Sequence, residues 1–402
     1  MGEKISIVDK IPIVDKDAFF LNIDKGSINS IKFIEVIGQG GSCLVYKARI
    51  QQGNNERYVV IKEYYPDEEN ILFPVTYHRE YAGMPLKILA KYEDDKKKEL
   101  VCQHANIDRE IYTNQRLYKV EDTHNNNPYI FHAWEAQLGE DYSDSSYIVI
   151  DTEEGETLKH AIRNKPQYRY TINESIIIIS KILEVLDYMN EKGCVHGDVS
   201  LENIYLSGHG DNTQVKLLDF GSGFFLSDYR ADIHDMDSVR AVADKIMMNS
   251  SLGSSHDEIR SSCAVDLERA KDQYRINNSE RNAKELVEVI NKWGIGVDLY
   301  AVVIVFFRMI TGKRYTGVPS IGELGRLLNK PYDSILIKTL HHILTKNDDD
   351  KYAVVEDLKQ DLQELCDIDK GEITPKSLIL KLEEEREKVD FNPLLIPQIE
   401  IV

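Results

Sequence analysis

The stretch VHGDVSLENI, Val195–Ile204, decides the fold, because it presents an acid and an amide from one short loop. The residues on either side have the pattern of short strands, and the loop between them holds Asp198 and Asn203. A carboxylate and an amide presented together suit a general base beside a metal ligand. Neither residue establishes that chemistry alone, so its partners must come from elsewhere in the chain.

The bulk composition limits the classes of partner. The chain has 402 residues, of which 42% are hydrophobic, and this length and composition predict a folded protein with a substantial core. The formal net charge is −19 and is spread along the chain, so the surface would repel the phosphates of nucleic acid and anionic lipid. We therefore expect no nucleic acid and no membrane as partners.

Cysteine usage and hydropathy predict a soluble, cytoplasmic protein. The five cysteines are odd in number, scattered, and without zinc-site spacing, which favours a reducing compartment. The first twenty residues contain no long apolar core of the kind that a secretory signal needs. The longest apolar run, Leu299–Phe307, is too short to span a bilayer and predicts a buried helix.

Local patterns predict an α+β fold with two lobes. Residues 27–62 alternate or run apolar with turn residues between them, which is typical of a small antiparallel sheet. Glu99–Val120 has helical spacing, and strand patterns return up to a junction near Asp151–Gly155. From there helical patterns dominate, beginning with a strong helix over Ile172–Gly193 that Asn173 is expected to cap.

These patterns divide the chain into four parts. We expect an N-terminal lobe of antiparallel sheet plus one helix and a mostly helical C-terminal lobe. The predicted boundaries are an N-terminal extension over 1–29, the N-lobe over 30–153 with an insertion near 66–98, the C-lobe over 154–368 with an insertion near 227–284, and a tail over 369–402.

Two further segments offer groups that bind phosphate. IGQGGSCLV carries glycines that let the backbone approach an anion, although many hairpins contain such a turn. VVIK ends in Lys62, which either extends to solvent or lies in a cleft where it meets phosphate oxygens. Glu110, in the predicted helix, is our choice for the acid that holds Lys62.

LLDFG supplies a second acid, Asp219, at the end of a buried strand. A carboxylate there is costly unless it is paired or bound to a metal. Asn203 and Asp219 begin and end one hairpin, so their side chains can meet around one cation. Amide and carboxylate oxygens are ligands that suit Mg²⁺.

In this order and spacing, the motifs resemble the protein kinase superfamily, in the form of an atypical, bacterial-like Hanks-type serine/threonine kinase. The resemblance covers about residues 30 to 366. It rests on GQGGSCLV, VVIK, Glu110, HGDVSLEN, DFG, the hinge-like YIVIDTEEGETL, and Asp298, which is similar to the acid that supports the catalytic loop.

The resemblance implies a role for each matched residue, with ATP and Mg²⁺ as cofactors. Asp198 would be the base, Lys62 held by Glu110 would bind the α- and β-phosphates, and Asn203 and Asp219 would hold the metal. The implied ATP-binding residues are Gly38, Gln39, Gly40, Gly41, Ser42, Val45, Val60, Lys62, Ile150, Asp151, Glu156 and Tyr205.

The departures from the family pattern are informative. Gly197 replaces the arginine that usually anchors an activation-segment phosphate, so we expect activity that is independent of such phosphorylation. Ser200 replaces the catalytic-loop lysine, and no threonine occurs between Asp219 and Asp298. Asn114 stands four residues after Glu110, where the family usually has an apolar residue.

Two segments fall outside the family pattern. The 227–284 insertion contains two helix-like runs and is either a solvated loop or an element that docks a partner or covers the cleft. The tail contains an amphipathic run, Glu372–Lys388, which either packs on the C-lobe or binds a partner.

The resemblance implies a protein serine/threonine kinase that transfers the ATP γ-phosphate to a protein hydroxyl. A small-molecule kinase of the aminoglycoside or choline type also uses HGD, and a pseudokinase scaffold is favoured by Ser200 and the long insertion. Glu154, Glu156 and Glu202 lie where peptide or ribose contacts fall, which favours a basic protein substrate.

Overall fold

The computed structural model describes most of the chain between residues 21 and 372. The described residues are 21–22, 28–39, 43–52, 54–64, 110–118, 127–138, 146–208, 212–248, 262–293, 295–349 and 351–372. The insertion expected at 66–98, the run Glu372–Lys388 beyond its first residue, and most of the N-terminal extension lie outside them.

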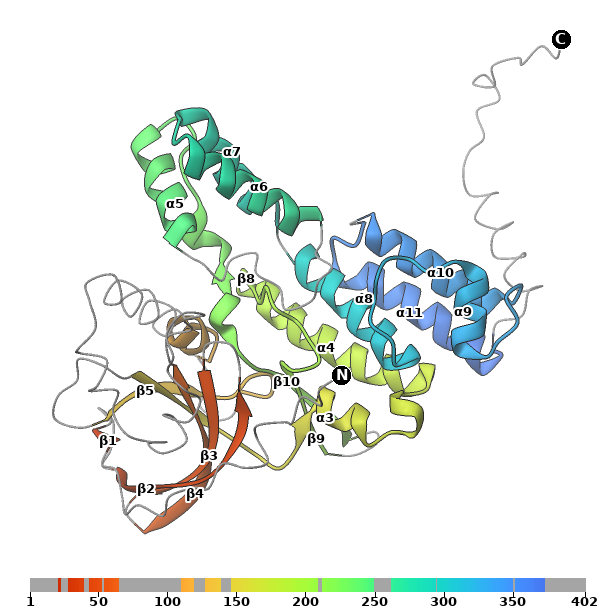
Figure 1. Ribbon diagram of the computed structural model, residues 1–402, viewed down its shortest axis with the longest axis horizontal. Helices are drawn as coiled ribbons and strands as arrows, with labels where there is room; N and C mark the ends of the chain where they lie inside the picture. Colours follow the sequence, from red (N-terminus) through yellow and green to blue (C-terminus); the bar gives the residue numbers. More distant parts are fainter. Residues whose placement is uncertain are drawn as a thin grey trace, which may run out of the picture.

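The N-terminal lobe is an antiparallel sheet of six strands in the order β1-β5-β6-β4-β3-β2, with a helix beside it (Figure 1). Its strands are β1 (Leu21–Asn22), β2 (Ile28–Gln39), β3 (Cys43–Gln52), β4 (Asn55–Tyr64), β5 (Ala133–Leu138) and β6 (Ser146–Asp151). The described part of the helix covers residues 110–118. This lobe confirms the expected sheet with one helix.

Strand register places four of the predicted ATP-binding residues, Val45, Val60, Lys62 and Ile150, on one face of the sheet. Lys62 lies opposite Val45 on β3 and opposite Ile148 on β6, and Val60 lies opposite Ile150. Directly opposed residues of an antiparallel pair share a face, as do residues two apart on one strand. Lys62 therefore projects from the same face as its apolar neighbours.

The C-terminal lobe is built around two apolar helices, α4 (Ile172–Glu191) and α8 (Gly296–Thr311). It also contains α3 (Leu158–Arg163), α9 (Ile321–Leu328), α10 (Ile335–Asp348) and α11 (Val355–Lys370). Side chains of α4, α8, α10 and α11 share one buried core. The expected two-lobed α+β architecture is confirmed.

The start of α4 differs from the expectation. Thr171, not Asn173, caps the helix: its hydroxyl accepts the N–H of Glu174, and the Glu174 carboxylate accepts the N–H of Thr171. This reciprocal capping box satisfies two donors at once, which a cap at Asn173 would not do. The expected end at Gly193 is present, because Gly193 follows the helix with a positive φ of 69°.

Short strands carry the loops between these helices. β9 (Ile204–Ser207) pairs with β10 (Gln214–Leu217) and with β7 (Glu156–Thr157), while β8 (Cys194–Val195) pairs with β11 (Phe224–Phe225). The loop that carries Asp198 and Asn203 thus runs from β8 to β9. The DFG residues follow β10 and precede β11.

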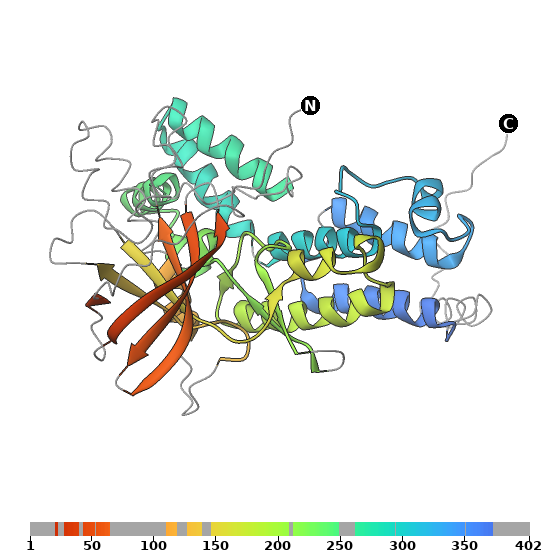
Figure 2. The same ribbon diagram turned by 60° about the horizontal axis from the view of Figure 1, so that its bottom comes forward.

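The expected insertion is a helical unit with its own core. It consists of α5 (Met236–Met248), α6 (Ser262–Ile276) and α7 (Glu280–Trp293), and we call it the α5–α7 unit. Figures 1 and 2 show it projecting from the C-lobe on the side of the N-lobe, away from α10 and α11. The alternative of a solvated loop is wrong for these described helices, and the unit runs past the expected boundary at 284.

Apolar residues of all three helices are buried together in the unit, with Phe224 and Tyr229 of the preceding segment.

In the part of the chain that the structure describes, no single helix is long and apolar enough to cross a membrane. The pair α7 and α8 passes that test together by length and composition alone, with a bend of 55° between the two helices.

We predict that the α5–α7 unit depends on its core for stability. Leu286 is fully buried in that core, whereas Ile276, on α6, is 85% exposed. Leu286→Ala should lower the free energy of unfolding by about 3 kcal/mol through lost burial and a cavity. Ile276→Ala, the matched control, should leave it nearly unchanged. Urea unfolding followed by circular dichroism measures both, and equal effects would contradict a packed unit.

Candidate active site

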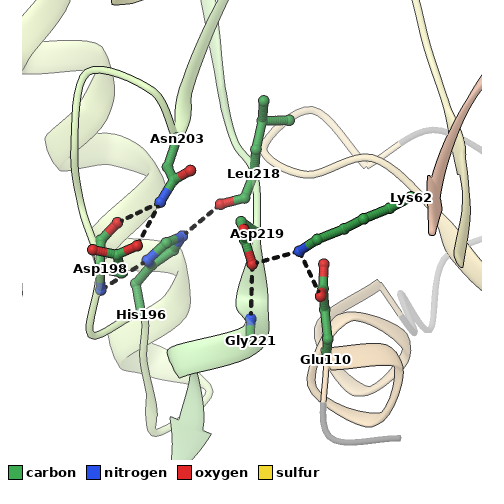
Figure 3. Close-up of polar contacts among 8 residues, drawn as sticks. All are labelled: Lys62, Glu110, His196, Asp198, Asn203, Leu218, Asp219 and Gly221. Carbon is green, nitrogen blue, oxygen red and sulfur yellow. Dashed lines mark hydrogen bonds and ion pairs between the residues drawn. The ribbon is translucent and has the colours of Figure 1, made fainter. Parts of the chain in front are cut away.

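A buried ammonium lies at the junction of the two lobes. Lys62 Nζ is 2.8 Å from Glu110 Oε2 and 2.9 Å from Asp219 Oδ1. Lys62 and Glu110 are 6% and 3% exposed, whereas the Asp219 side chain is 39% exposed. Figure 3 shows the ammonium between the two carboxylates. The contact expected between Lys62 and Glu110 is present, and Asp219 joins it from the other lobe.

Asn114 explains how the helix over 110–118 is held at the angle that this pair requires. Its amide nitrogen donates to Phe131 O and its amide oxygen accepts the N–H of Ala133, each at 2.9 Å. Asn114 is 4% exposed, so both of its polar groups are satisfied inside the protein. Where the family usually has an apolar contact, this chain fastens the helix to Phe131 and to the first residue of β5 by two hydrogen bonds.

Asp198 and Asn203 form the second part of the site. Asn203 Nδ2 donates to Asp198 Oδ2 and to Asp198 O, both at 2.9 Å. The backbone of the same loop is hydrogen-bonded to the segment between β10 and Asp219, where the N–H of Leu218 donates to Asn203 O at 2.8 Å. The acid is therefore held in one orientation by the amide five residues further along.

His196 ties this loop to the DFG segment. Its ring is fully buried, with Nε2 3.0 Å from Leu218 O and Nδ1 3.3 Å from the backbone N of Asp198. These contacts fit a neutral ring in which Nε2–H donates to the carbonyl and Nδ1 accepts the N–H. His196 thus connects Leu218, the residue before Asp219, to the backbone of Asp198.

Asp298, at the start of α8, supports the loop from below. Its carboxylate accepts the backbone N–H groups of His196 and Gly197, each at 2.8 Å. Burial raises the pKa of Asp298 above its usual value, even though the two N–H groups favour the ionised form. The contact implied by the family resemblance is therefore present.

Gly197 is required by the backbone at its position. Its φ is +76°, and a Cβ added there would lie 2.9 Å from Ser222 O. Any other residue would meet both the left-handed conformation and the backbone of the DFG turn. Gly155 is constrained by close packing alone, because a Cβ there would lie 2.2 Å from Leu206 O.

Asp219 has an unusual backbone and a perturbed carboxyl group. Its φ is +61°, a conformation that costs free energy for a residue other than glycine, and its Oδ1 accepts the N–H of Gly221 at 3.2 Å. Burial acts to raise the pKa of Asp219, but the Lys62 ammonium and the Gly221 N–H outweigh it, so the pKa lies below its usual value. The carboxylate is thus kept ionised.

Three of the expected ATP-binding residues, Val45, Ile150 and Tyr205, lie on β3, β6 and β9. Val45 and Ile150 pack against the buried cluster of Ile111, Ala133 and Ile148 in the N-lobe. Tyr205 donates its hydroxyl to Glu153 O at 2.8 Å, which joins β9 to the segment linking the lobes.

The remaining predicted residues fall into three groups: acids with ionic partners, residues at the end of β2, and residues that are not described. The Asp151 carboxylate contacts Arg57, and the Glu156 carboxylate contacts His160. Gly38 pairs with Val45 at the end of β2, and Gln39 ends that strand. Gly40, Gly41 and Ser42 lie outside the described residues.

The sequence of this chain is similar to those of known proteins over part of its length. Residues 75–243 match the family model of the protein kinase domain. CDPK-related kinase 5 of Arabidopsis thaliana is 33% identical over 114 residues, which are 28% of this chain and 17% of that protein. A probable serine/threonine-protein kinase of Clostridium perfringens is 26% identical over 196 residues, or 48% of this chain and 21% of that protein.

Among solved structures, the PknI kinase domain of Mycobacterium tuberculosis is 12% identical, with a TM-score of 0.46 and coverage of 84% of this chain and 96% of that one. The chain is thus similar to protein kinase domains over residues 75–243, which are less than half of its length. It spans less than a quarter of the length of either curated relative named above.

We predict a specific pH dependence from Asp219. Because its pKa is lower in the folded protein than in the unfolded chain, its ionised form stabilises the fold above the unfolded pKa, about 3.9. That contribution is lost as the pH falls through the folded pKa. The difference in unfolding free energy between the parent and Asp219→Asn should be constant above about pH 5 and shrink below about pH 4. Urea unfolding at several pH values measures this, and a pH-independent difference would contradict it.

Proposed function

We propose that this protein is an ATP-dependent protein serine/threonine kinase. The observation that carries the proposal is the pairing of Lys62 with Glu110 and Asp219, set beside the Asp198–Asn203 pair on the loop facing it. A fold that only bound a partner would have no chemical need for a fixed acid at Asp198. The curated relatives named above are protein kinases, which favours this function over a small-molecule kinase or a scaffold.

The residues present fit ATP and Mg²⁺. Asn203 uses its amide nitrogen on Asp198, which leaves the amide oxygen as a metal ligand, and Asp219 supplies an ionised carboxylate. An amide oxygen and a carboxylate are a donor set that Mg²⁺ accepts while it keeps positions for water and phosphate. When bound there, the metal would neutralise charge on the transferred phosphate. Lys62 supplies a buried cation for the other phosphates.

The protein's part in the reaction is to position groups and to move one proton. Asp198 Oδ2 accepts a hydrogen bond from Asn203, so the carboxylate faces the substrate in one orientation. It would take the proton of the substrate hydroxyl as that oxygen bonds to the γ-phosphorus and the bond to the leaving ADP oxygen breaks. Lys62 binds and orients the phosphates, and Glu110 holds Lys62 in place.

A protein hydroxyl is the proposed acceptor, and a basic substrate stays a prediction. Two of the three acids expected to attract one already face cations: Glu202 lies 2.5 Å from Lys159 Nζ, and Glu156 contacts His160. Glu154 is exposed on the segment between the lobes. It is therefore the acid that we expect to contribute most to binding a basic side chain of a substrate. Partner docking to the α5–α7 unit or the tail, the absence of nucleic acid and membrane partners, and a cytoplasmic location likewise stay predictions.

We predict that Asp198→Asn abolishes phosphate transfer without unfolding the protein. Amide for carboxylate keeps the shape but removes the base, so the rate should fall by about 10²–10⁴-fold. Intact mass after incubation with Mg²⁺ and ATP, alone and with a basic protein such as myelin basic protein, measures transfer. Added phosphate in the parent but not in the variant is the expected result. No transfer by the parent to either acceptor would count against a protein kinase and lead to assays with small alcohols.

We predict that activity does not need phosphate on the activation segment. Gly197 stands where an arginine would anchor such a phosphate, and its conformation excludes other side chains. Protein dephosphorylated by a phosphatase that is then removed should transfer phosphate at its initial rate, without the lag that activation by autophosphorylation produces. A lag that disappears after preincubation with ATP would overturn this expectation.

A further inference from the structure

One arginine on the helix over 110–118 contacts the segment that follows DFG. Arg116 Nη1 is 3.0 Å from Asp228 Oδ1, and Arg116 Nη2 is 3.2 Å from Ser227 Oγ. The guanidinium carbon also lies 3.8 Å from the centre of the Phe225 ring. Guanidinium groups combine a planar set of donors with stacking on aromatic faces, so this one side chain holds two kinds of group at once.

Other residues of the same helix contact the same segment. Thr113 Oγ1 donates to Gly223 O at 3.4 Å, and the Tyr112 ring packs edge-on against Phe225 at 6.3 Å. Tyr112 also accepts a hydrogen bond from Arg116 at 2.8 Å. The helix that carries Glu110 at its described start is therefore fastened to the DFG segment along its length.

The far side of this segment is fastened to the α5–α7 unit. Tyr229, one residue after Asp228, is buried in the core of the unit. Lys245 of α5 donates to Asp228 O at 3.0 Å, and its ammonium lies 5.0 Å from the Tyr229 ring. The residue that pairs with Arg116 is thus held by the unit on its other side.

We propose that Arg116 is a positioning residue, which holds the helix of Glu110, and through it Lys62, against a segment fixed by the α5–α7 unit. The role of Lys62 in catalysis rests on the proposed function. The contacts run without a break from the unit to Asp228, to Arg116, along the helix to Glu110, and to the ammonium of Lys62. Asp228 gives Arg116 a carboxylate partner that does not depend on an added phosphate.

The geometry favours a positioning role over an ordinary surface ion pair. Side chains of Arg116 and Asp228 are 37% and 22% exposed, and exposed pairs alone contribute little. This pair differs because its two members lie 112 residues apart, on elements of different lobes, and because the guanidinium also stacks on Phe225, which is 1% exposed. The pair therefore fixes two bodies relative to each other.

The first readout is the reactivity of Lys62 and does not depend on catalysis. The full chain is treated briefly with acetic anhydride, and acetylation of each lysine is followed by mass spectrometry. Arg116→Met keeps apolar contact with Phe225 but removes the charge, and Lys62 should react about tenfold faster as Glu110 moves away. Asp228→Asn, which removes only the partner charge, should act in the same direction, and Arg116→Lys should restore most of the protection.

Controls separate positioning from general loosening. Arg269→Met removes an exposed ion pair with Asp266, 2.9 Å in the parent, whose two members both lie on α6. It should leave the reactivity of Lys62 unchanged, and Lys346, paired with Asp361 in the C-lobe, should react equally in all variants. The double variant Arg116→Met with Asp228→Asn should be no more reactive at Lys62 than either single variant. Unchanged Lys62 reactivity in a folded Arg116→Met protein would overturn the proposal.

The second readout uses activity and separates the two proposals. If the parent transfers phosphate, Arg116→Met should lower kcat about tenfold, whereas Arg269→Met should leave kcat unchanged. A kcat equal to that of the parent would overturn the positioning role. If the parent transfers no phosphate, the proposed function fails, and the reactivity of Lys62 still decides whether Arg116 positions the helix.

Discussion

A single buried cation determines how the lobes of this protein meet. The Lys62 ammonium comes from the central part of the N-lobe sheet, and its two carboxylate partners come from the helix over 110–118 and from the DFG turn. Burying one unpaired charge costs several kcal/mol, so the sheet, the helix and the turn are stable together only in this arrangement. Asn114 also fastens this helix to the sheet, because it makes one hydrogen bond to Phe131 and one to Ala133, the first residue of β5.

A second buried charge organises the larger lobe in the same manner. Asp298 accepts hydrogen bonds from two backbone N–H groups of the loop that carries Asp198. The buried ring of His196, in the same loop, contacts the carbonyl oxygen of Leu218. The loop that carries Asp198 and the segment that leads into Asp219 are therefore held by one network of hydrogen bonds. This network explains why Gly197 is glycine: the loop lies so close to Ser222 that no side chain fits, and the arginine common in the family would be excluded on steric grounds.

The sequence predicted the charged groups better than it predicted their supports. The order of the motifs was enough to pair Lys62 with Glu110, because a buried charge needs a specific partner and few positions offer one. Asp298 was indicated by the family resemblance. The cap of α4 was assigned to Asn173 instead of Thr171, because both residues are good caps and only the reciprocal bond with Glu174 distinguishes them. The α5–α7 unit was left open, since its surfaces are highly charged and its core forms only when three separate helices meet.

The departures from the family pattern become consistent once the contacts are considered together. Loss of the arginine at Gly197 removes a phosphate anchor, and the chain instead has Asp228 facing Arg116 and a segment fixed by Tyr229 in the core of the α5–α7 unit. A carboxylate carries its charge at all times near neutral pH, whereas a phosphate must be added. Contacts of this kind favour an arrangement of Lys62 and Glu110 that is built into the fold and is held by the α5–α7 unit through the segment that contains Asp228.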